Sequence, residues 1–333
     1  MKISVVSPFF NEQAIIATAA RVMIDRLASR FEDWELILVD DGSRDDSLAR
    51  LTSALTEADA AHVRVLSYPA NKGRGHALKT GIDAATGDII VTTETDLSWG
   101  EDIVERLVAV LTADPDVDVV VASVHMAGGG LANVPPHRVF LTNVGNQLIR
   151  SCVSRELTMY TGMTRAYRRE VIQPLEVHER GKEFHLEVIL KLMTLGFVIR
   201  EIPATITWAV GKQDKKPTRK SSTKLFQTIV SHLRFSLVGK PSQYFGLAAL
   251  ASAAAAALFL GWALINLLTG AVAAYAATVG LILAVMALTF GGFSALFTEL
   301  REILRGQWAA SYPSSLQRLV SARKVRRAFP PEG

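Results

Sequence analysis

The chain has 333 residues, of which 49% are hydrophobic, so it is too long for one typical domain and can bury a large core. Its formal net charge of +4 does not by itself point to a class of partner. The single cysteine, Cys152, excludes an intrachain disulfide and agrees with a reducing compartment.

Short apolar runs alternate with amphipathic stretches through the first third of the chain. The pattern predicts strands near residues 3–7, 35–39, 63–67, 89–93 and 117–122, and helices near 13–29, 45–57, 75–85 and 100–112. This alternation predicts βαβ units, and therefore an α/β fold with a mostly parallel central sheet. Because the first predicted strand starts at residue 3, we expect no signal peptide before it.

Acidic side chains follow two of the predicted strands. Asp40 and Asp41 come directly after one apolar run, and Glu94 and Asp96 come after another. Ligands of open α/β sheets bind at the carboxyl ends of the strands, so we expect these groups to converge on one crevice. Carboxylates at such an edge hold sugar hydroxyls, base edges or a divalent metal ion. The alternative is two unrelated loops that carry the same residue types.

A loop rich in glycine and basic residues opens the third predicted helix. Gly73 and Gly75 allow a close approach of the backbone to a ligand, and Lys72, Arg74 and the helix N-terminus favour an anion. The spacing matches neither a P-loop nor a dinucleotide-binding fingerprint.

The C-terminal third is strongly apolar. No Asp, Glu, Lys or Arg occurs from Pro241 to Thr298, and at about 20 residues per helix this run can cross a hydrocarbon core of about 30 Å twice. Thr269 and Gly270 are the natural break, so we expect two antiparallel membrane helices over residues 244–268 and 271–297. The alternative is a pair of buried helices in a soluble domain.

Basic residues flank both ends of this apolar hairpin. This pattern predicts an even number of spans with the N-terminal domain on the cytoplasmic side. Residues 223–239 have the spacing of an amphipathic helix in the membrane interface, with packing on the globular domain as the alternative. Because the basic residues crowd these flanks without interleaved aromatics, we expect anionic lipid or a lipid phosphate as the partner and no nucleic acid. The basic residues are Lys212, Lys215, Lys216, Arg219, Lys220, Lys224, Arg234 and Lys240 before the hairpin, and Arg301, Arg305, Arg318, Arg323, Lys324, Arg326 and Arg327 after it.

Four motifs, in this order and spacing, resemble the family 2 glycosyltransferases of GT-A fold. They are residues 7–12 (SPFFNE), 40–43 (DDGS), 71–77 (NKGRGHA) and 94–98 (ETDLS). The resemblance is closest to the branch of dolichol-phosphate mannose synthase and the bacterial polyprenyl-phosphate glycosyltransferases. It implies a GT-A nucleotide-sugar-binding domain over residues 1–215. An interfacial helix at 216–240, two transmembrane helices at 241–298 and a basic cytoplasmic tail at 299–333 complete the expected organisation.

The resemblance also implies roles for individual residues on the donor side. Glu94, Thr95 and Asp96 stand where the family has its Asp-x-Asp motif, so Glu94 and Asp96 are expected to act in catalysis by binding Mg²⁺ or Mn²⁺ and through it the diphosphate. Glu94 keeps the charge of the first Asp on a longer arm. Ser98 stands where many relatives have Gln as a further ligand, so it is a candidate third metal ligand beside Glu94 and Asp96. The residues expected around the nucleotide are Pro8, Glu12, Asp40, Asp41, Lys72 and Thr95.

The acceptor side departs more from the family pattern. Arg138, in a predicted helix at 138–155, matches a basic position that approaches the lipid phosphate in relatives and is expected to act in catalysis there; a solvated surface Arg is the alternative. Lys212 or Lys215 is expected to supply a positive charge that relatives place at Trp208. Thr158 replaces an Asp of the Ser-Gly-Phe-Arg region, which residues 161–169 resemble.

A Phe-x-x-Glu motif of the family has its counterpart in Phe184 to Glu187. The alternative reading of Glu187 is a helix surface residue that orients Arg or Lys neighbours.

The leading hypothesis is a membrane-anchored, inverting glycosyltransferase that moves one sugar from a GDP- or UDP-linked donor to a polyprenyl phosphate. A lipid hydroxyl acceptor is one alternative, and it would need a general base. A degenerate transferase that binds nucleotide or serves as a scaffold is another. A processive polysaccharide synthase is disfavoured because two spans form no obvious export channel and a Gln-x-x-Arg-Trp motif is absent from the sequence.

Overall fold

The computed structural model describes residues 1–136, 139, 142–143, 146–147, 156–181, 183–208, 241–270, 272–311, 314 and 316–321. Arg138, Lys212, Lys215, most of the predicted helix at 138–155 and the amphipathic stretch at 223–239 lie outside these residues. The chain divides into two compact units, which are described separately. The first comprises Met1–Arg150, Arg155–Lys216 and Ala309–Gly333, and the second comprises Ser151–Ser154 and Pro217–Trp308.

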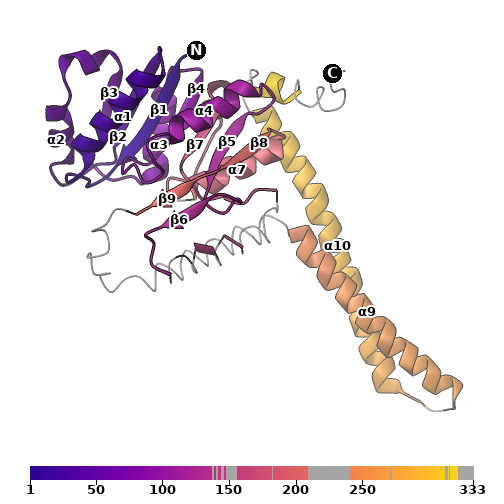
Figure 1. Cartoon of the computed structure of the whole chain (residues 1–333). Coiled ribbons are helices and arrows are strands. Elements are labelled where there is room, and N and C mark those ends of the chain that lie inside the picture. The colour runs from indigo at the N-terminus through magenta and orange to yellow at the C-terminus, as the bar shows by residue number, and fades with distance from the viewer. Residues whose placement is uncertain are drawn as a thin grey trace. The chain divides into compact units, whose positions relative to one another are not determined.

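The first unit is built on a seven-stranded sheet within the described residues, with strand order β3-β2-β1-β4-β7-β5-β8 (Figure 1). β7 is antiparallel to its neighbours β4 and β5, and the other neighbouring strands are parallel. β6 and β9 form a second, short parallel sheet. The α/β fold with a mostly parallel sheet is therefore confirmed. The strands are β1 (Ile3–Phe9), β2 (Trp34–Asp40), β3 (Val63–Ser67), β4 (Ile89–Thr92), β5 (Val119–Ser123), β6 (Gly130–Ala132), β7 (Arg165–Arg168), β8 (Ile199–Pro203) and β9 (Thr205–Thr207).

The four helices predicted between residues 13 and 112 are present, with shifted ends. The helix predicted over residues 45–57 ends at Ala54, because Thr56 and Asp59 form a capping box that starts a separate 3₁₀ turn. The strand predicted from residue 117 begins at Val119, because the Val117 N–H closes a turn onto the Asp114 carbonyl. The helices of the first unit are α1 (Ile16–Arg30), α2 (Ser47–Ala54), the 3₁₀ turn η1 (Glu57–Ala61), α3 (Arg74–Ala84), α4 (Ile103–Ala113), α6 (Arg169–Ile172) and α7 (Phe184–Leu195).

The central strands are buried on both faces. Val5 of β1 packs in one cluster with Met23 of α1 and Ile103 of α4. Its neighbour Val6 faces the opposite side, where Gly81 of α3 lies against it. Helices thus cover both faces, and the carboxyl ends of β1, β2 and β4 are left to open into the loops that carry the acidic motifs.

Gly81 is the point of closest approach between α3 and the sheet. A Cβ at this position would overlap Cγ1 of Val6 and lie 3.1 Å from Cγ2 of Val39. Gly81→Ala is expected to lower the free energy of unfolding by about 1–3 kcal/mol, because overpacking outweighs the gain in helix propensity. Thermal unfolding of the full chain in detergent measures this effect. Val6→Ala removes the overlapping methyl, so the double variant should lose less stability than the sum of the two single variants. Additive losses would contradict the overlap.

The described part of the second unit is an antiparallel pair of long helices, α9 (Pro241–Leu268) and α10 (Ala274–Ser311), the last three residues of α10 being assigned to the first unit (Figure 1). The Phe245 ring packs on Phe290, Phe293 and Phe297, and the Ser294 hydroxyl donates a hydrogen bond to the Ser242 carbonyl at 2.7 Å. Segments Pro241–Leu268 and Ala274–Leu300 are each long and apolar enough to cross a membrane. The predicted apolar hairpin is therefore present as two candidate membrane-spanning helices.

The ends of the second helix differ from the prediction. The break at Thr269 and Gly270 is confirmed, and Gly270 takes a positive φ of 82°. However, α10 begins at Ala274 and continues to Ser311, beyond the predicted end at residue 297. Charged residues mark the end of an apolar span, but Glu and Arg are good helix formers and do not end the helix itself. Leu316, which follows α10 and belongs to the first unit, is fully buried.

Candidate active site

The loops after β1 and β2 hold each other in place. The Asn11 N–H donates to the Ser43 hydroxyl at 3.0 Å, and the Arg44 N–H donates to the Asn11 side-chain oxygen at 2.8 Å. Asn11 has a φ of 55°, a left-handed conformation that Asn tolerates. The Glu12 N–H donates to the Ser47 hydroxyl at 2.8 Å. Glu12, predicted to lie near the nucleotide, therefore stands on a braced loop that lines a surface hollow together with Asn11 and Arg44.

Asp40 and Asp41 are both buried at the end of β2. Asp40 accepts hydrogen bonds from the Ser43 N–H at 2.9 Å and from the Ser67 hydroxyl at 3.0 Å. It therefore closes its own turn and joins it to β3.

Asp41 is the anchor of the next loop. One of its oxygens accepts hydrogen bonds from the Tyr68 hydroxyl at 2.5 Å and from the N–H groups of Lys72 and Gly73 at 3.0 and 3.1 Å. The other accepts the Asn71 side-chain amide at 2.9 Å. Four donors from residues 68–73 thus converge on one buried carboxylate, which holds the glycine-rich loop at the start of α3.

Tyr68 completes this arrangement. Its burial, and then its hydrogen bond to Asp41, raise the pKa of the Tyr68 hydroxyl, so it remains a protonated donor. The Lys72 ammonium lies 5.1 Å from the centre of the Tyr68 ring. Tyr68 was not among the predicted site residues, since an isolated Tyr between a strand and a loop carries no motif of its own.

Thr95 is turned inward between the two acidic residues of its motif. It is buried, and its hydroxyl donates to the Pro8 carbonyl at 3.0 Å and lies 2.8 Å from the Ser7 hydroxyl. These contacts join the segment after β4 to the end of β1. The predicted nucleotide residues Pro8 and Thr95 are therefore brought together, and the Thr95 side chain itself serves this join.

Glu94 and Asp96 stand on either side of Thr95. Two donors reach Glu94 Oε2: the Ser98 hydroxyl at 3.1 Å and the Trp99 indole N–H at 3.2 Å. Arg74, the first residue of α3, places its Nη1 3.5 Å from Glu94 Oε1. Asp96 Oδ1 accepts the Ser98 N–H at 3.1 Å. Leu97, at the apex of this turn, has a φ of 53°, which is rare for a residue with a Cβ and branched side chain.

The two acidic strand ends are linked through Arg74. The loop anchored by Asp41 ends at Gly73, and the following residue, Arg74, reaches Glu94. The Glu94 and Asp96 carboxylates offer the hard oxygen ligands that Mg²⁺ and Mn²⁺ prefer. The Arg74 guanidinium beside Glu94 shows that a positive charge fits next to this carboxylate. Within the described residues, no group of three or more His, Cys, Asp or Glu side chains could by itself hold a metal ion. Two carboxylates fit Mg²⁺ or Mn²⁺ when substrate phosphate supplies further ligands.

The segment from β7 to α7 forms a buried polar layer. The Arg165 side chain is fully buried and donates to the carbonyls of Tyr160 at 2.6 Å and His185 at 2.9 Å. Burial, followed by the charges of Arg165 and Arg74, holds the pKa of His185 well below its usual value, so its imidazole is neutral. The guanidinium of Arg165 thus braces backbone carbonyls in the interior.

Glu187 is buried, which corrects the alternative of a helix surface residue. It pairs with Lys191 at 2.7 Å and accepts the N–H groups of His178 and Glu179. Burial favours the neutral carboxyl, but these hydrogen bonds and the Lys191 charge outweigh it and lower the pKa of Glu187. The loop that Glu187 holds then crosses the start of α3, where the His76 N–H donates to the Arg180 carbonyl at 3.2 Å.

Comparison with known proteins identifies the family. The model of glycosyl transferase family 2 matches residues 4–175, which is more than half of the chain. The undecaprenyl-phosphate 4-deoxy-4-formamido-L-arabinose transferase of Klebsiella pneumoniae is 34% identical over 184 residues, covering 54% of this chain and 53% of that protein. The protein of the same description from Salmonella choleraesuis is 33% identical over 181 residues. The chain thus spans about half the length of these curated relatives.

Solved structures agree on the fold. Glucosyl-3-phosphoglycerate synthase from Mycobacterium tuberculosis, crystallised with Mn²⁺, UDP-glucose and phosphoglyceric acid, superposes with a TM-score of 0.53 at 20% identity and covers 71% of this chain and 79% of its own. The similarity confirms the predicted GT-A fold. Because the family model matches more than half of the chain, the chain belongs to glycosyl transferase family 2.

Proposed function

We propose that this protein transfers one sugar from a nucleoside diphosphate sugar to a polyprenyl phosphate at the cytoplasmic face of a membrane. The observation that carries the proposal is the meeting of Glu94 with Arg74, which brings the Asp-x-Asp-like motif to the loop that Asp41 anchors. Relatives named as undecaprenyl-phosphate transferases and the two candidate membrane-spanning helices support a lipid phosphate acceptor.

On the donor side, the braced loop with Glu12 and the loop anchored by Asp41 form the nucleotide site, with Pro8, Asp40 and Lys72 around it. The Lys72 ammonium and the N-terminus of α3 favour the diphosphate. Glu94 and Asp96 are the residues that would hold Mg²⁺ or Mn²⁺. When bound, such an ion neutralises the departing nucleoside diphosphate. The Mn²⁺ and UDP-glucose in the crystallised glucosyl-3-phosphoglycerate synthase support this assignment and favour UDP over GDP as the first donor to test.

On the acceptor side, a lipid phosphate is already an anion at neutral pH. It attacks the anomeric carbon without a strong general base, and the carbon–oxygen bond to the diphosphate breaks in the same in-line displacement, with inversion. The protein then contributes mainly orientation and electrostatic stabilisation. Arg138, Lys212 and Lys215 are proposed to bind the acceptor phosphate. The basic residues on both sides of the hairpin favour a cytoplasmic catalytic domain.

The test is sugar transfer by full-length protein in membrane vesicles. Radiolabelled UDP- and GDP-sugars are supplied with undecaprenyl phosphate or diacylglycerol, and with Mg²⁺, Mn²⁺ or EDTA. We expect metal-dependent label in an acid-labile lipid, formed with undecaprenyl phosphate and only in inverted vesicles, whose cytoplasmic face is outside. Label in an acid-stable lipid would assign a hydroxyl acceptor instead. Transfer by sealed right-side-out vesicles would overturn the orientation, and nucleotide binding without transfer from any donor would favour a binding protein.

A further inference from the structure

The carboxylate of Glu94 has an unusual set of neighbours for a group expected to bind metal. Its Oε2 accepts two hydrogen bonds, from the Ser98 hydroxyl and from the Trp99 indole, while Arg74 lies by Oε1. The two donors hold Oε2 in position. Oε1 accepts neither of these hydrogen bonds and faces the Arg74 guanidinium instead. The two oxygens of Glu94 therefore have different neighbours.

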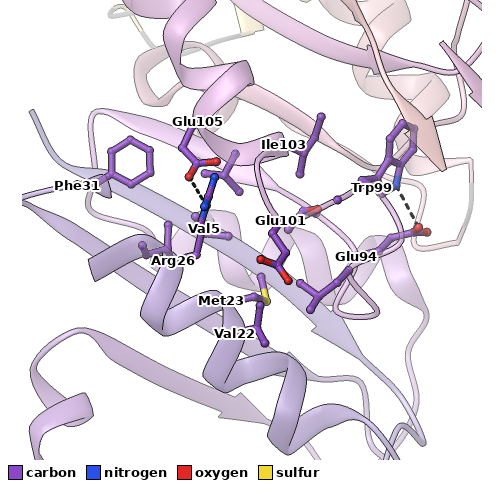
Figure 2. Close-up of a pocket in the computed structure, with 15 residues that line it drawn as sticks. Val5, Val22, Met23, Arg26, Phe31, Glu94, Trp99, Glu101, Ile103 and Glu105 are labelled. Atoms are coloured by element: carbon purple, nitrogen blue, oxygen red, sulfur yellow. Dashed lines mark hydrogen bonds and ion pairs between the residues drawn. The ribbon is translucent and has the colours of Figure 1, made fainter. Parts of the chain in front are cut away.

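Trp99 is well placed to hold Glu94 rigidly. It is 4% exposed, and Figure 2 shows its ring nitrogen directed at the Glu94 carboxylate. A buried indole N–H needs an acceptor, and a carboxylate is a strong one. Because the indole is packed in the core next to α4, it cannot follow a moving side chain, and the hydrogen bond restrains Glu94 instead.

The packing behind this pair leaves a small cavity. A cavity of about 30 Å³ lies between α1 and α4, lined by Met23, Leu97, Trp99 and Ile103 among others. This volume has room for only about two water molecules. At one end an ion pair between Arg26 and Glu105, 2.6 Å apart, spans from α1 to α4 (Figure 2). The ion pair thus joins the two helices whose residues line this cavity together with Trp99.

We propose that Trp99, assisted by Ser98, is a positioning residue that fixes the long side chain of Glu94 so that one oxygen is aimed at the metal. This inference rests on the proposed function of Glu94 and Asp96. A Glu has one more rotatable bond than an Asp, and without restraint it would lose more side-chain entropy on binding an ion. The two donors to Oε2 remove this freedom before the ion binds. Ser98 accordingly acts through Glu94, and its hydroxyl is a support for the metal carboxylate.

The experiment measures Mn²⁺ binding directly, by the loss of the free Mn²⁺ signal in electron paramagnetic resonance, with UDP present and the full chain in detergent. Trp99→Phe keeps an aromatic ring but removes the N–H. We expect the Mn²⁺ dissociation constant to rise about tenfold, in line with other residues that orient metal ligands. Transfer activity at saturating Mn²⁺ should return to within about threefold of wild type, because the chemistry is untouched. Trp34→Phe, at a buried tryptophan stacked on His62, is the matched control and should change neither quantity.

A double-variant cycle separates positioning from simple packing. Glu94→Asp shortens the side chain and withdraws it from Trp99, so it should also weaken Mn²⁺ binding about tenfold. Combined with Trp99→Phe, it should add little, because the contact is already lost. Independent, multiplying losses would overturn the positioning role. If Asp96→Asn binds Mn²⁺ as wild type does, the proposed metal site itself fails. If Asp96→Asn loses Mn²⁺ while Trp99→Phe binds it normally, only the role of Trp99 is refuted.

Discussion

Asp96→Asn is expected to lower sugar transfer by about 10³-fold, the scale of losing a main electrostatic contribution to a transition state. The substitution removes one of the two negative charges offered to the metal but keeps the size of the side chain. The Asn oxygen can still accept the Ser98 N–H that Asp96 Oδ1 accepts at 3.1 Å, so the turn should keep its shape. Transfer of label from the active nucleotide sugar measures the effect, with the unfolding temperature recorded alongside.

The matched control for this prediction is Asp25→Asn on the outer face of α1, where the side chain is 67% exposed. It should leave both transfer and thermal stability unchanged. If Asp96→Asn retained a tenth or more of the wild-type rate with the same dependence on Mn²⁺, Asp96 would not be a metal carboxylate. A fall in the unfolding temperature that matched the loss of activity would instead point to damage to the fold.

Asp41→Ala is expected to have the second largest effect, on both stability and donor binding. It leaves the Tyr68 hydroxyl, the Asn71 amide and the N–H groups of Lys72 and Gly73 without their buried acceptor. Stranded buried donors cost about 1–3 kcal/mol each, and because this surface-facing loop can relax toward water we expect a total loss of about 3 kcal/mol. The same relaxation moves Arg74 away from Glu94, so kcat/KM for the donor should fall about 10²-fold.

Two milder variants test the cause of that effect. Tyr68→Phe removes one of the four donors and should have a smaller effect on stability than Asp41→Ala. Asp41→Asn keeps one acceptor oxygen but turns the other into a donor that faces the Asn71 amide, so it should fall between the two. Thermal unfolding and titration of UDP by calorimetry give the two readouts. An Asp41→Ala protein with wild-type stability would show that the carboxylate does not anchor the loop.

Much of this architecture could be predicted from local patterns. The strand Val63–Ser67 coincides with its prediction, since a short segment with valines at alternating positions, between a turn and a glycine-rich loop, is typical of a strand. Ends of helices were less predictable, as the capping box at Thr56 and Asp59 illustrates. The antiparallel strand β7 had no sequence signal for its direction, because strand pairing depends on where a distant segment returns to the sheet.

The candidate site, too, has features that the sequence predicts and features that only the fold determines. The sequence by itself determined which residues carry charge at the strand ends, Asp40, Asp41, Glu94 and Asp96, and that a long uncharged segment follows, because composition and period are local properties. Only the tertiary structure decided that the Asp41 carboxylate accepts hydrogen bonds from the loop of Tyr68, that the Thr95 hydroxyl donates to the Pro8 carbonyl, and that the Trp99 indole donates to Glu94. Each of these contacts depends on the direction of a side chain and on which partner, distant in sequence, lies within hydrogen-bonding distance of it. Hydrogen-bond geometry of that kind is set by packing across the sheet and is not encoded in any one motif.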